Sequence, residues 1–255
     1  MSALGFGFIE LGTVTPRPQK GNPKPRLFRI KPEMALINSL GFNNKGVDYL
    51  VDKVSKRSSK TPLGISIGKN FDTSNEKAVL DYLLCLEKVY EYSSYIAVNI
   101  SSPNTKNLRD LETSRFFNDL STSLKRKQET LSEVHGYRPL LFKISPDIDE
   151  EGLRVLSKSI LDNKIDGIIC TNTSIHHDHH SQKGGLSGAP LLERSSEILK
   201  KVRSLVGPDL PIIASGGVMS FEAFQQKLDC GADLVQIYTG MIYKGPNLIE
   251  EILNN

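Results

Sequence analysis

Asn99-Ile100-Ser101-Ser102-Pro103-Asn104-Thr105 follows the short apolar run 95–98. The run is rich in residues that favour β-structure, so the sequence predicts a buried strand that passes into a polar loop. A plain turn would account for the Asn and Ser side chains, because these often hydrogen-bond their own backbone. Pro103, however, biases Ser102 towards an extended conformation, and α/β barrels place their chemistry at the carboxyl ends of strands. A turn and a functional loop both remain open for this stretch.

Seven short apolar segments of the chain predict β-strands, with predicted helices between them. Residues 43–55 have helical apolar spacing, Thr73 and Glu76 have the spacing of a capping box, and Asp149 and Ser220 are suited to cap later helices. This alternation predicts a parallel sheet with right-handed crossovers. The predicted strands begin near Phe6, Leu63, Tyr95, Leu140, Gly167, Pro211 and Leu234.

A closed (β/α)8 barrel needs eight strands, so this count leaves one strand missing. Seven strands also fit an open sheet. The polar or Gly-rich ends of nearly every predicted strand favour the barrel, because so many strand ends converge on one point only when the sheet curls round. We therefore predict an α/β fold, a TIM (β/α)8 barrel that lacks its first strand in this chain, with residues 1–255 as a single domain.

Composition excludes several classes of protein. The chain of 255 residues is 38% hydrophobic and 24% charged, which is typical of a globular domain. A net charge of +3 with scattered Lys and Arg gives no indication of nucleic-acid binding. Cys85, Cys170 and Cys230 lack metal-ligand spacing and predict reduced thiols in an intracellular protein. No apolar run reaches the ~18 residues of a membrane span.

Two Gly-containing segments, Ser215-Gly216-Gly217 and Tyr238-Thr239-Gly240, end the last two predicted strands. Barrels bind phosphate at this position, because Gly lets backbone N–H groups approach an anion, although two tight turns would look the same. Lys143 lies in the apolar segment 140–144. A lysine there either points outward at the strand end or belongs to a site, where it would face an anion, an electron-rich ring or a carbonyl group.

A cluster of histidines, His176, His177, His179 and His180, lies in a polar loop with one aspartate. Structural metal sites normally have ordered ligand pairs, and this cluster has no such spacing. We interpret it as a solvated loop or lid and predict no metal site.

Several of these motifs together resemble those of the dihydroorotate dehydrogenases, over almost the whole length of the chain. The Asn99–Thr105 loop is one of them. Ser102 stands where the resemblance places the catalytic base of the quinone-dependent, membrane-associated class, whereas the soluble class carries cysteine there. The other matching segments are 9–19, 25–29, 41–44, 67–70, 184–188 and 236–238.

The resemblance implies an oxidoreductase of pyrimidine biosynthesis, a flavoprotein that oxidises dihydroorotate to orotate with FMN and a membrane quinone. Ser102 would remove the C5 proton while the C6 hydride passes to the flavin, and Lys143 would stabilise the reduced flavin. Thr105 and Phe42 match positions that shape a proton path. The location implied is the cytoplasmic side of the cell membrane, with peripheral attachment.

The same resemblance implies the residues around each ligand. Those for the cofactor are Thr13, Ser66, Asn99, Lys143, Thr171, Gly188, Gly217, Tyr238 and Thr239. The last three of these would surround the phosphate. Those for the substrate are Asn38, Ser39, Leu40, Gly41, Phe42, Asn99, Asn104, Asn172 and Thr173. Asn side chains suit this role because each offers a donor and an acceptor to a planar ring.

The chain departs from the family pattern in three places. A first-strand segment with a lysine that touches flavin and substrate is absent, as is the N-terminal helical pair that docks on the membrane. Ser66 stands where the family usually has asparagine, and the loop 175–183 is short. We therefore expect an N-terminally truncated enzyme that is weakly active or inactive alone.

Three alternatives remain open. One is an inactive barrel remnant with binding or structural roles only. Another is a soluble-class dehydrogenase linked to fumarate or NAD, which Ser102 disfavours. The third is a phosphate-binding barrel isomerase, which would leave the Asn99–Thr105 loop without a purpose.

Overall fold

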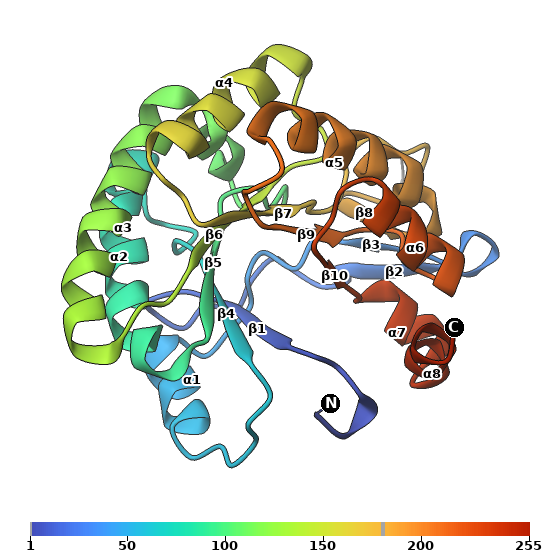
Figure 1. Cartoon of the computed structure of the whole chain (residues 1–255), viewed down its shortest axis with the longest axis horizontal. Helices are drawn as coiled ribbons and strands as arrows, with labels where there is room; N and C mark the ends of the chain where they lie inside the picture. The colour runs from blue at the N-terminus through green and yellow to red at the C-terminus, as the bar shows by residue number, and fades with distance from the viewer. Residues whose placement is uncertain (1, 180–181) are drawn as a thin grey trace.

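A computed structural model describes residues 2–179 and 182–255. Its centre is a curved, seven-stranded parallel sheet (Figure 1), as the sequence predicts. In spatial order its strands are β1 (Ile9–Val14), β4 (Leu63–Ile67), β5 (Tyr95–Asn99), β6 (Leu140–Ile144), β7 (Gly167–Cys170), β9 (Ile212–Ser215) and β10 (Leu234–Gln236).

Helices surround the outer face of this sheet (Figure 1). The alternation of side chains along β5 explains the two cores. Ile96 and Val98 pack in the large core between the sheet and the helices. Tyr95 and Ala97 point to the other face, where they form a smaller cluster with Leu141 of the neighbouring strand β6. The helices are α1 (Val47–Val54), α2 (Ala78–Val89), α3 (Ser114–His135), α4 (Glu150–Asp162), α5 (Leu192–Val206), α6 (Phe221–Asp229), α7 (Thr239–Lys244) and α8 (Asn247–Leu253).

A second, three-stranded antiparallel sheet was not anticipated by the sequence reasoning. It consists of β2 (Leu27–Ile30), β3 (Ala35–Asn38) and β8 (Gly185–Gly188), in that spatial order. None of the seven predicted strands covers β8, because the sequence reasoning interprets the Gly-rich stretch after the strand near Gly167 as a loop; that interpretation is wrong for β8. Backbone pairing explains the difference, because Gly185 and Gly188 pair with Asn38 and Ala35 of β3. This small sheet carries residues of β3 and β8 to the site described below.

The parallel sheet does not close within residues 2–179 and 182–255, because β1 and β10 form its two unpaired edges. Side chains connect these edges: Glu10 Oε2 accepts hydrogen bonds from Gln236 Nε2 at 2.8 Å and from the Tyr95 hydroxyl at 2.9 Å. The fold is a TIM barrel that lacks one strand. None of the helices among the described residues combines the length and apolar character needed to cross a membrane.

Candidate active site

A pocket of ≈ 400 Å³ lies at the carboxyl ends of the strands. Such a volume is within the usual range for small-molecule sites. Among the described residues that line it, Lys143 is the one charged side chain. Most of the predicted site residues lie here: Thr13, Asn38, Leu40, Gly41, Phe42, Asn99, Ser102, Asn104, Lys143, Thr171, Asn172, Thr173, Gly188, Gly217, Tyr238 and Thr239.

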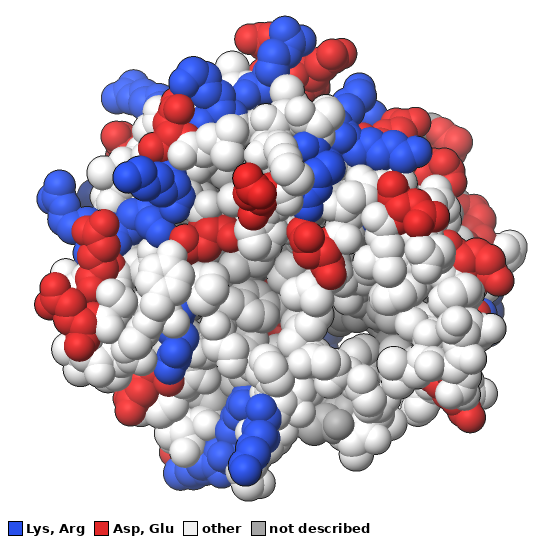
Figure 2. All heavy atoms as spheres, in the orientation of Figure 1, with Lys and Arg blue, Asp and Glu red and all other residues white. Residues whose placement is uncertain are grey.

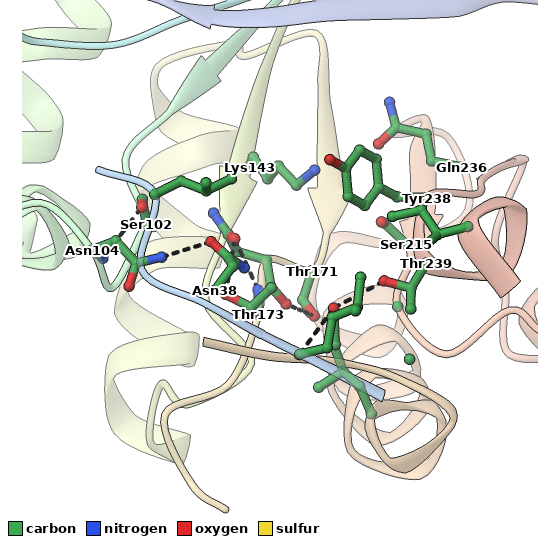
Figure 3. A pocket seen from close by; sticks show the side chains of 18 of the residues that line it. Asn38, Ser102, Asn104, Lys143, Thr171, Thr173, Ser215, Gln236, Tyr238 and Thr239 are labelled. Carbon is green, nitrogen blue, oxygen red and sulfur yellow. Dashed lines mark hydrogen bonds between the residues drawn. The ribbon is translucent and has the colours of Figure 1, made fainter. Parts of the chain in front are cut away.

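Ser102 lies on the loop after β5 and is 6% exposed. Its Oγ accepts a hydrogen bond from the Asn104 backbone N–H at 3.3 Å. A donor at this oxygen favours the deprotonated hydroxyl, because hydrogen bonding to a charged form stabilises that form. In Figure 3, Ser102 and Asn104 lie on one side of the pocket and Tyr238 and Thr239 on the other.

Four carboxamides belong to two hydrogen-bonded pairs. Asn104 Nδ2 donates to Asn38 Oδ1 at 3.0 Å, and Asn172 Nδ2 donates to Asn99 Oδ1 at 3.2 Å. Asn99 Nδ2 in turn donates to Thr13 Oγ1 at 2.8 Å. These bonds fix the amide groups, so the donors and acceptors that remain free face the pocket in set directions.

Lys143 projects across the pocket from β6 (Figure 3). Its neighbours along the strand, Phe142 and Ile144, point into the outer core instead. Within the described chain, the Lys143 ammonium has no carboxylate at ion-pair distance. A cation in a pocket without acidic residues attracts an anionic ligand or stabilises developing negative charge.

The two Gly-containing segments line the opposite side of the pocket, as predicted. Gly216 and Gly217 have φ values of +112° and +80°, which L side chains rarely adopt. The backbone N–H groups of Gly217 and Val218 donate to no acceptor in the described residues and remain free for a ligand. The Thr239 hydroxyl lies 2.9 Å from that of Ser187 on β8.

Two predicted site residues lie outside the pocket lining. Ser66 is 4% exposed, and its hydroxyl lies 2.9 Å from that of Thr13, which stands between Ser66 and the pocket. Ser39 is held through its backbone, whose N–H donates to Arg26 O at 2.9 Å. Thr105 also lies behind the lining; its buried Oγ1 has no hydrogen-bond partner within the described residues.

Sequence reasoning missed Arg109, which connects three of the loops at the pocket. Arg109 Nε donates to Ser101 O at 3.0 Å, Nη1 to Asp147 Oδ2 at 2.7 Å, and Nη2 to Thr173 O at 2.9 Å. The three acceptors follow β5, β6 and β7. The only signal in the sequence is an arginine shortly after the loop, which identifies none of these partners.

Glu112 is a buried carboxyl behind the same loops. Its Oε1 accepts the Ser145 N–H at 2.6 Å. Burial raises the pKa of Glu112 to about 8, although the Ser145 hydrogen bond and the charge of Arg109 act in the opposite direction.

The histidine cluster contributes nothing to the pocket lining among the described residues. His177 Nε2 lies 3.2 Å from Gly184 O, and His179 Nε2 lies 3.1 Å from Glu33 Oε2. His180 lies outside the described residues. Within 2–179 and 182–255, no three His, Cys, Asp or Glu side chains are arranged to hold a metal ion.

Comparisons with known proteins agree with the fold. The sequence profile of the family described as "Dihydroorotate dehydrogenase" matches residues 1–255. A protein of Aliivibrio salmonicida named "Dihydroorotate dehydrogenase (quinone)" is 52% identical over 260 residues, which cover 99% of this chain and 77% of the relative. A protein of Acinetobacter baylyi with the same name is 51% identical over 261 residues, covering 100% of this chain and 78% of the relative.

A solved structure gives the same result in three dimensions. The crystal structure of DHODH in complex with ferulenol from Eimeria tenella matches with a TM-score of 0.91 and 33% identity. The match covers 98% of this chain and 75% of that one. In sequence and in fold, the chain belongs to the dihydroorotate dehydrogenase family.

Proposed function

We propose that this chain oxidises dihydroorotate to orotate in pyrimidine biosynthesis, with FMN as cofactor and a quinone as electron acceptor, and that residues 1–255 act as one FMN-binding domain. The observation that carries the proposal is the composition of the pocket. One buried serine, the four carboxamides of the two hydrogen-bonded pairs and one lysine are among the residues that line the same cavity. Relatives about 50% identical over nearly the whole chain are named for the quinone-linked reaction.

The pocket fits a flavin with a phosphate group. The free N–H groups of Gly217 and Val218, with Thr239 beside them, suit the phosphate. We assign Thr13, Thr171 and Gly188, which line the pocket, to the flavin ring system, and Lys143 to the positive charge that would stabilise the reduced flavin. The absence of acidic side chains from the described lining agrees with an anionic cofactor and an anionic substrate.

The chain's own residues divide the chemistry between holding and proton transfer. Asn38, Asn99, Asn104 and Asn172 bind the amide edges and carboxylate of dihydroorotate. Ser102 removes the proton from C5, and its Oγ is prepared for this by the N–H of Asn104. FMN held in this pocket would supply the acceptor for the C6 hydride, and loss of that hydride together with the C5 proton leaves a C5–C6 double bond.

A serine hydroxyl is a weak base and needs an exit for its proton. We assign that exit to Thr105, whose buried Oγ1 has no partner among the described residues, with Phe42 excluding bulk water from the pocket. A hydroxyl that is free to accept and donate can pass a proton on through ordered water.

The proposal that a quinone is the electron acceptor is supported by the apolar residues of the pocket lining. Leu27 and Ile242 line the pocket and are 54% and 37% exposed. An apolar edge that is open to solvent suits the approach of a quinone, and we propose peripheral association with a membrane on this ground. The cytoplasmic side is proposed from the resemblance to the quinone-dependent class alone.

The experiment is a purification of the chain followed by its visible spectrum and a dihydroorotate oxidation assay. We expect bound FMN, and slow orotate formation with a quinone analogue but not with fumarate or NAD. Ser102→Ala should retain FMN and lose activity by about 100-fold or more at neutral pH. Ser121→Ala is the control, because Ser121 is equally buried on α3 and does not line the pocket.

Each alternative predicts a different outcome, and the phosphate-binding barrel isomerase predicts sugar-phosphate binding without bound flavin. Absence of flavin in the purified protein favours an inactive barrel remnant. Rapid turnover with fumarate favours the soluble class. Turnover of Ser102→Ala at the rate of the unmodified chain would exclude Ser102 as the base.

A further inference from the structure

Lys227 on α6 is fully buried beneath the Gly-containing side of the pocket and takes no part in the reaction described above. Its Nζ donates to Ser195 Oγ at 2.5 Å and to Ser196 Oγ at 2.9 Å, with Leu192 O at 3.4 Å. All three acceptors are uncharged and belong to the first turns of α5. The ammonium therefore has a complete set of hydrogen bonds but no counterion.

A buried charge without a partner is costly to the folded state. Among the described residues, no carboxylate lies within ion-pair distance of Lys227; Glu193 acts on it only from further away. Burial lowers the pKa of Lys227 as a result. A cation kept at such a position suggests an anion that is bound during function.

The contacts of Lys227 lead directly to the Gly216–Gly217 loop. Ser195, which accepts from Lys227, has its Oγ 3.0 Å from Gly216 O. The loop also lies against α5, since a Cβ on Gly217 would approach Leu192 Cα to 2.3 Å. The lysine, the start of α5 and the loop thus form one packed unit under the free N–H groups of Gly217 and Val218.

We propose that Lys227 is a positioning residue for the phosphate of FMN: its buried positive charge and its hydrogen bonds to Ser195 and Ser196 hold the Gly216–Gly217 loop in its phosphate-binding shape and supply the charge that the phosphate balances. This inference rests on the proposed FMN site. It assigns a role to a residue that does not line the pocket, and it concerns only the phosphate end of the cofactor.

Two ligands that differ by the phosphate alone provide the test. FMN and riboflavin are titrated into the flavin-free chain, and the dissociation constants are measured by fluorescence. Lys227→Gln removes the charge but keeps a hydrogen-bond donor on a side chain one atom shorter, whereas Lys227→Met, of similar length to Gln, removes both the charge and the donor. We expect both variants to bind FMN about tenfold or more weakly, equivalent to ~1.4 kcal/mol, with riboflavin affinity unchanged.

A second measurement needs no substitution at Lys227. Without ligand, burial lowers the pKa of Lys227 to about 8, so the cation is lost as the pH rises through that value. The phosphate is already ionised, with a pKa of about 6, so FMN affinity should fall relative to riboflavin affinity between about pH 7 and 9. The other titratable groups acting on Lys227 are Glu193, Cys170 and Cys230. Burial raises the pKa of Cys170 to about 12, and a Cys230→Ala control removes the third group.

The outcomes separate this inference from the proposed function. If the unmodified chain binds neither flavin, the proposed function itself fails. If it binds FMN, and Lys227→Gln weakens FMN and riboflavin equally or neither, Lys227 has only a structural role. If the variants do not fold, the pH measurement on the unmodified chain decides. A ratio of FMN to riboflavin affinity that stays constant across the pH range overturns the inference.

Discussion

Arg109 shows how one side chain outside the pocket sets the geometry inside it. Its guanidinium uses three nitrogens to hold the loops after β5, β6 and β7. Arginine suits this role because its planar fork offers several donors in fixed directions, which a lysine ammonium lacks. The position of Ser102 relative to Asn172 therefore depends on a residue that touches neither.

We expect Arg109→Lys to keep the charge and the fold but to release at least one of the three loops. Displacement of a reacting group by about 1 Å costs on the order of 100-fold in rate, so turnover should fall by about that factor. The measurement is kcat for dihydroorotate oxidation together with flavin content. Arg154→Lys is the control, because Arg154 is an exposed residue of α4. Equal turnover of the two variants would show that the contacts of Arg109 do not position the loop.

Glu112 makes the stability of the protein depend on pH. Its pKa is raised to about 8 in the folded chain, above the ordinary value of 4.5. The folded state therefore holds the proton more tightly, and the stabilisation is full below about pH 4.5 and is lost as the pH rises to about 8. The difference between the two pKa values limits this contribution of Glu112 to the free energy of unfolding to about 4 to 5 kcal/mol.

Glu112→Gln should remove this contribution while keeping an acceptor for the Ser145 N–H. We expect the free energy of unfolding of the unmodified chain to decrease more between pH 5 and 8 than that of the variant, as measured by urea denaturation. Parallel pH profiles for the two proteins would contradict the assignment.

Pocket residues could be predicted from the sequence where their residue type and their position in the chain indicated a site. Ser102, Lys143 and the Asn residues at 99, 104 and 172 lie in the pocket, and their types and places at predicted strand ends indicated a site there, whereas Asn38 was assigned by resemblance alone. Arg109 and Lys227 could not be found in this way, because their roles depend on partners far along the chain. Ser66 and Ser39 were assigned by resemblance, which gives position in the chain but not exposure to the cavity.

At the level of elements, the Gly216–Gly217 loop depends on two separate properties of glycine. Gly217 has positive φ, and it also lies against the backbone of Leu192. Gly207, which ends α5, has nearly the same φ of +78° but nothing within 4 Å of an added Cβ. The two positions therefore separate backbone strain from steric contact.

We expect Gly207→Ala to lower the free energy of unfolding by about 1 kcal/mol, the cost of left-handed backbone for an L residue. Gly217→Ala should lower it by about 3 kcal/mol, because overpacking adds to the same strain. It should also weaken FMN binding, which Gly207→Ala leaves intact. Urea denaturation and flavin titration measure both effects. Similar values for the two variants would mean that the contact with Leu192 relaxes at little cost.

Elements defined by local patterns were predicted well. The Asp149 side chain accepts from Gly152 N at 2.7 Å and caps α4, and Ser220 caps α6 as expected. The capping box at Thr73 and Glu76 is wrong, since α2 begins after a 3-10 turn and its N-cap residue is Lys77. Strand β8 was missed because its short Gly-rich sequence has no apolar alternation; only pairing with distant β3 makes it a strand.

At the scale of the whole molecule, side chains hold the two edges of the sheet together. Glu10 on β1 and Gln236 on β10 share a hydrogen bond across the opening. Figure 2 shows that charged side chains of both signs lie mainly around the periphery of this face, while its middle is largely uncharged. The sequence predicted the seven strands of the parallel sheet and its one missing strand correctly, but not the small antiparallel sheet. It gave no indication that Glu10, Tyr95 and Gln236 would meet.

A double-mutant cycle with Glu10→Ala and Gln236→Ala measures the bridge. We expect a coupling free energy of about 1 kcal/mol, the usual contribution of one hydrogen bond, from urea denaturation of the two single variants and the double variant. Tyr95→Phe serves as a reference for the second bond to Glu10. Additive effects of the two substitutions would show that the bond between Glu10 and Gln236 contributes nothing to stability in solution.

The pocket also draws its walls from nearly the whole length of the chain, from Gly12 to Ile242. Synthesis proceeds from the N-terminus at roughly 5–20 residues per second, so the phosphate side emerges from the ribosome after every other wall. A nascent or prematurely terminated chain has no complete flavin site, and ligand stabilisation reaches only chains translated past Ile242. Bound flavin would therefore stabilise completed chains and not incomplete ones, and proteases in the cell would act selectively on the incomplete chains.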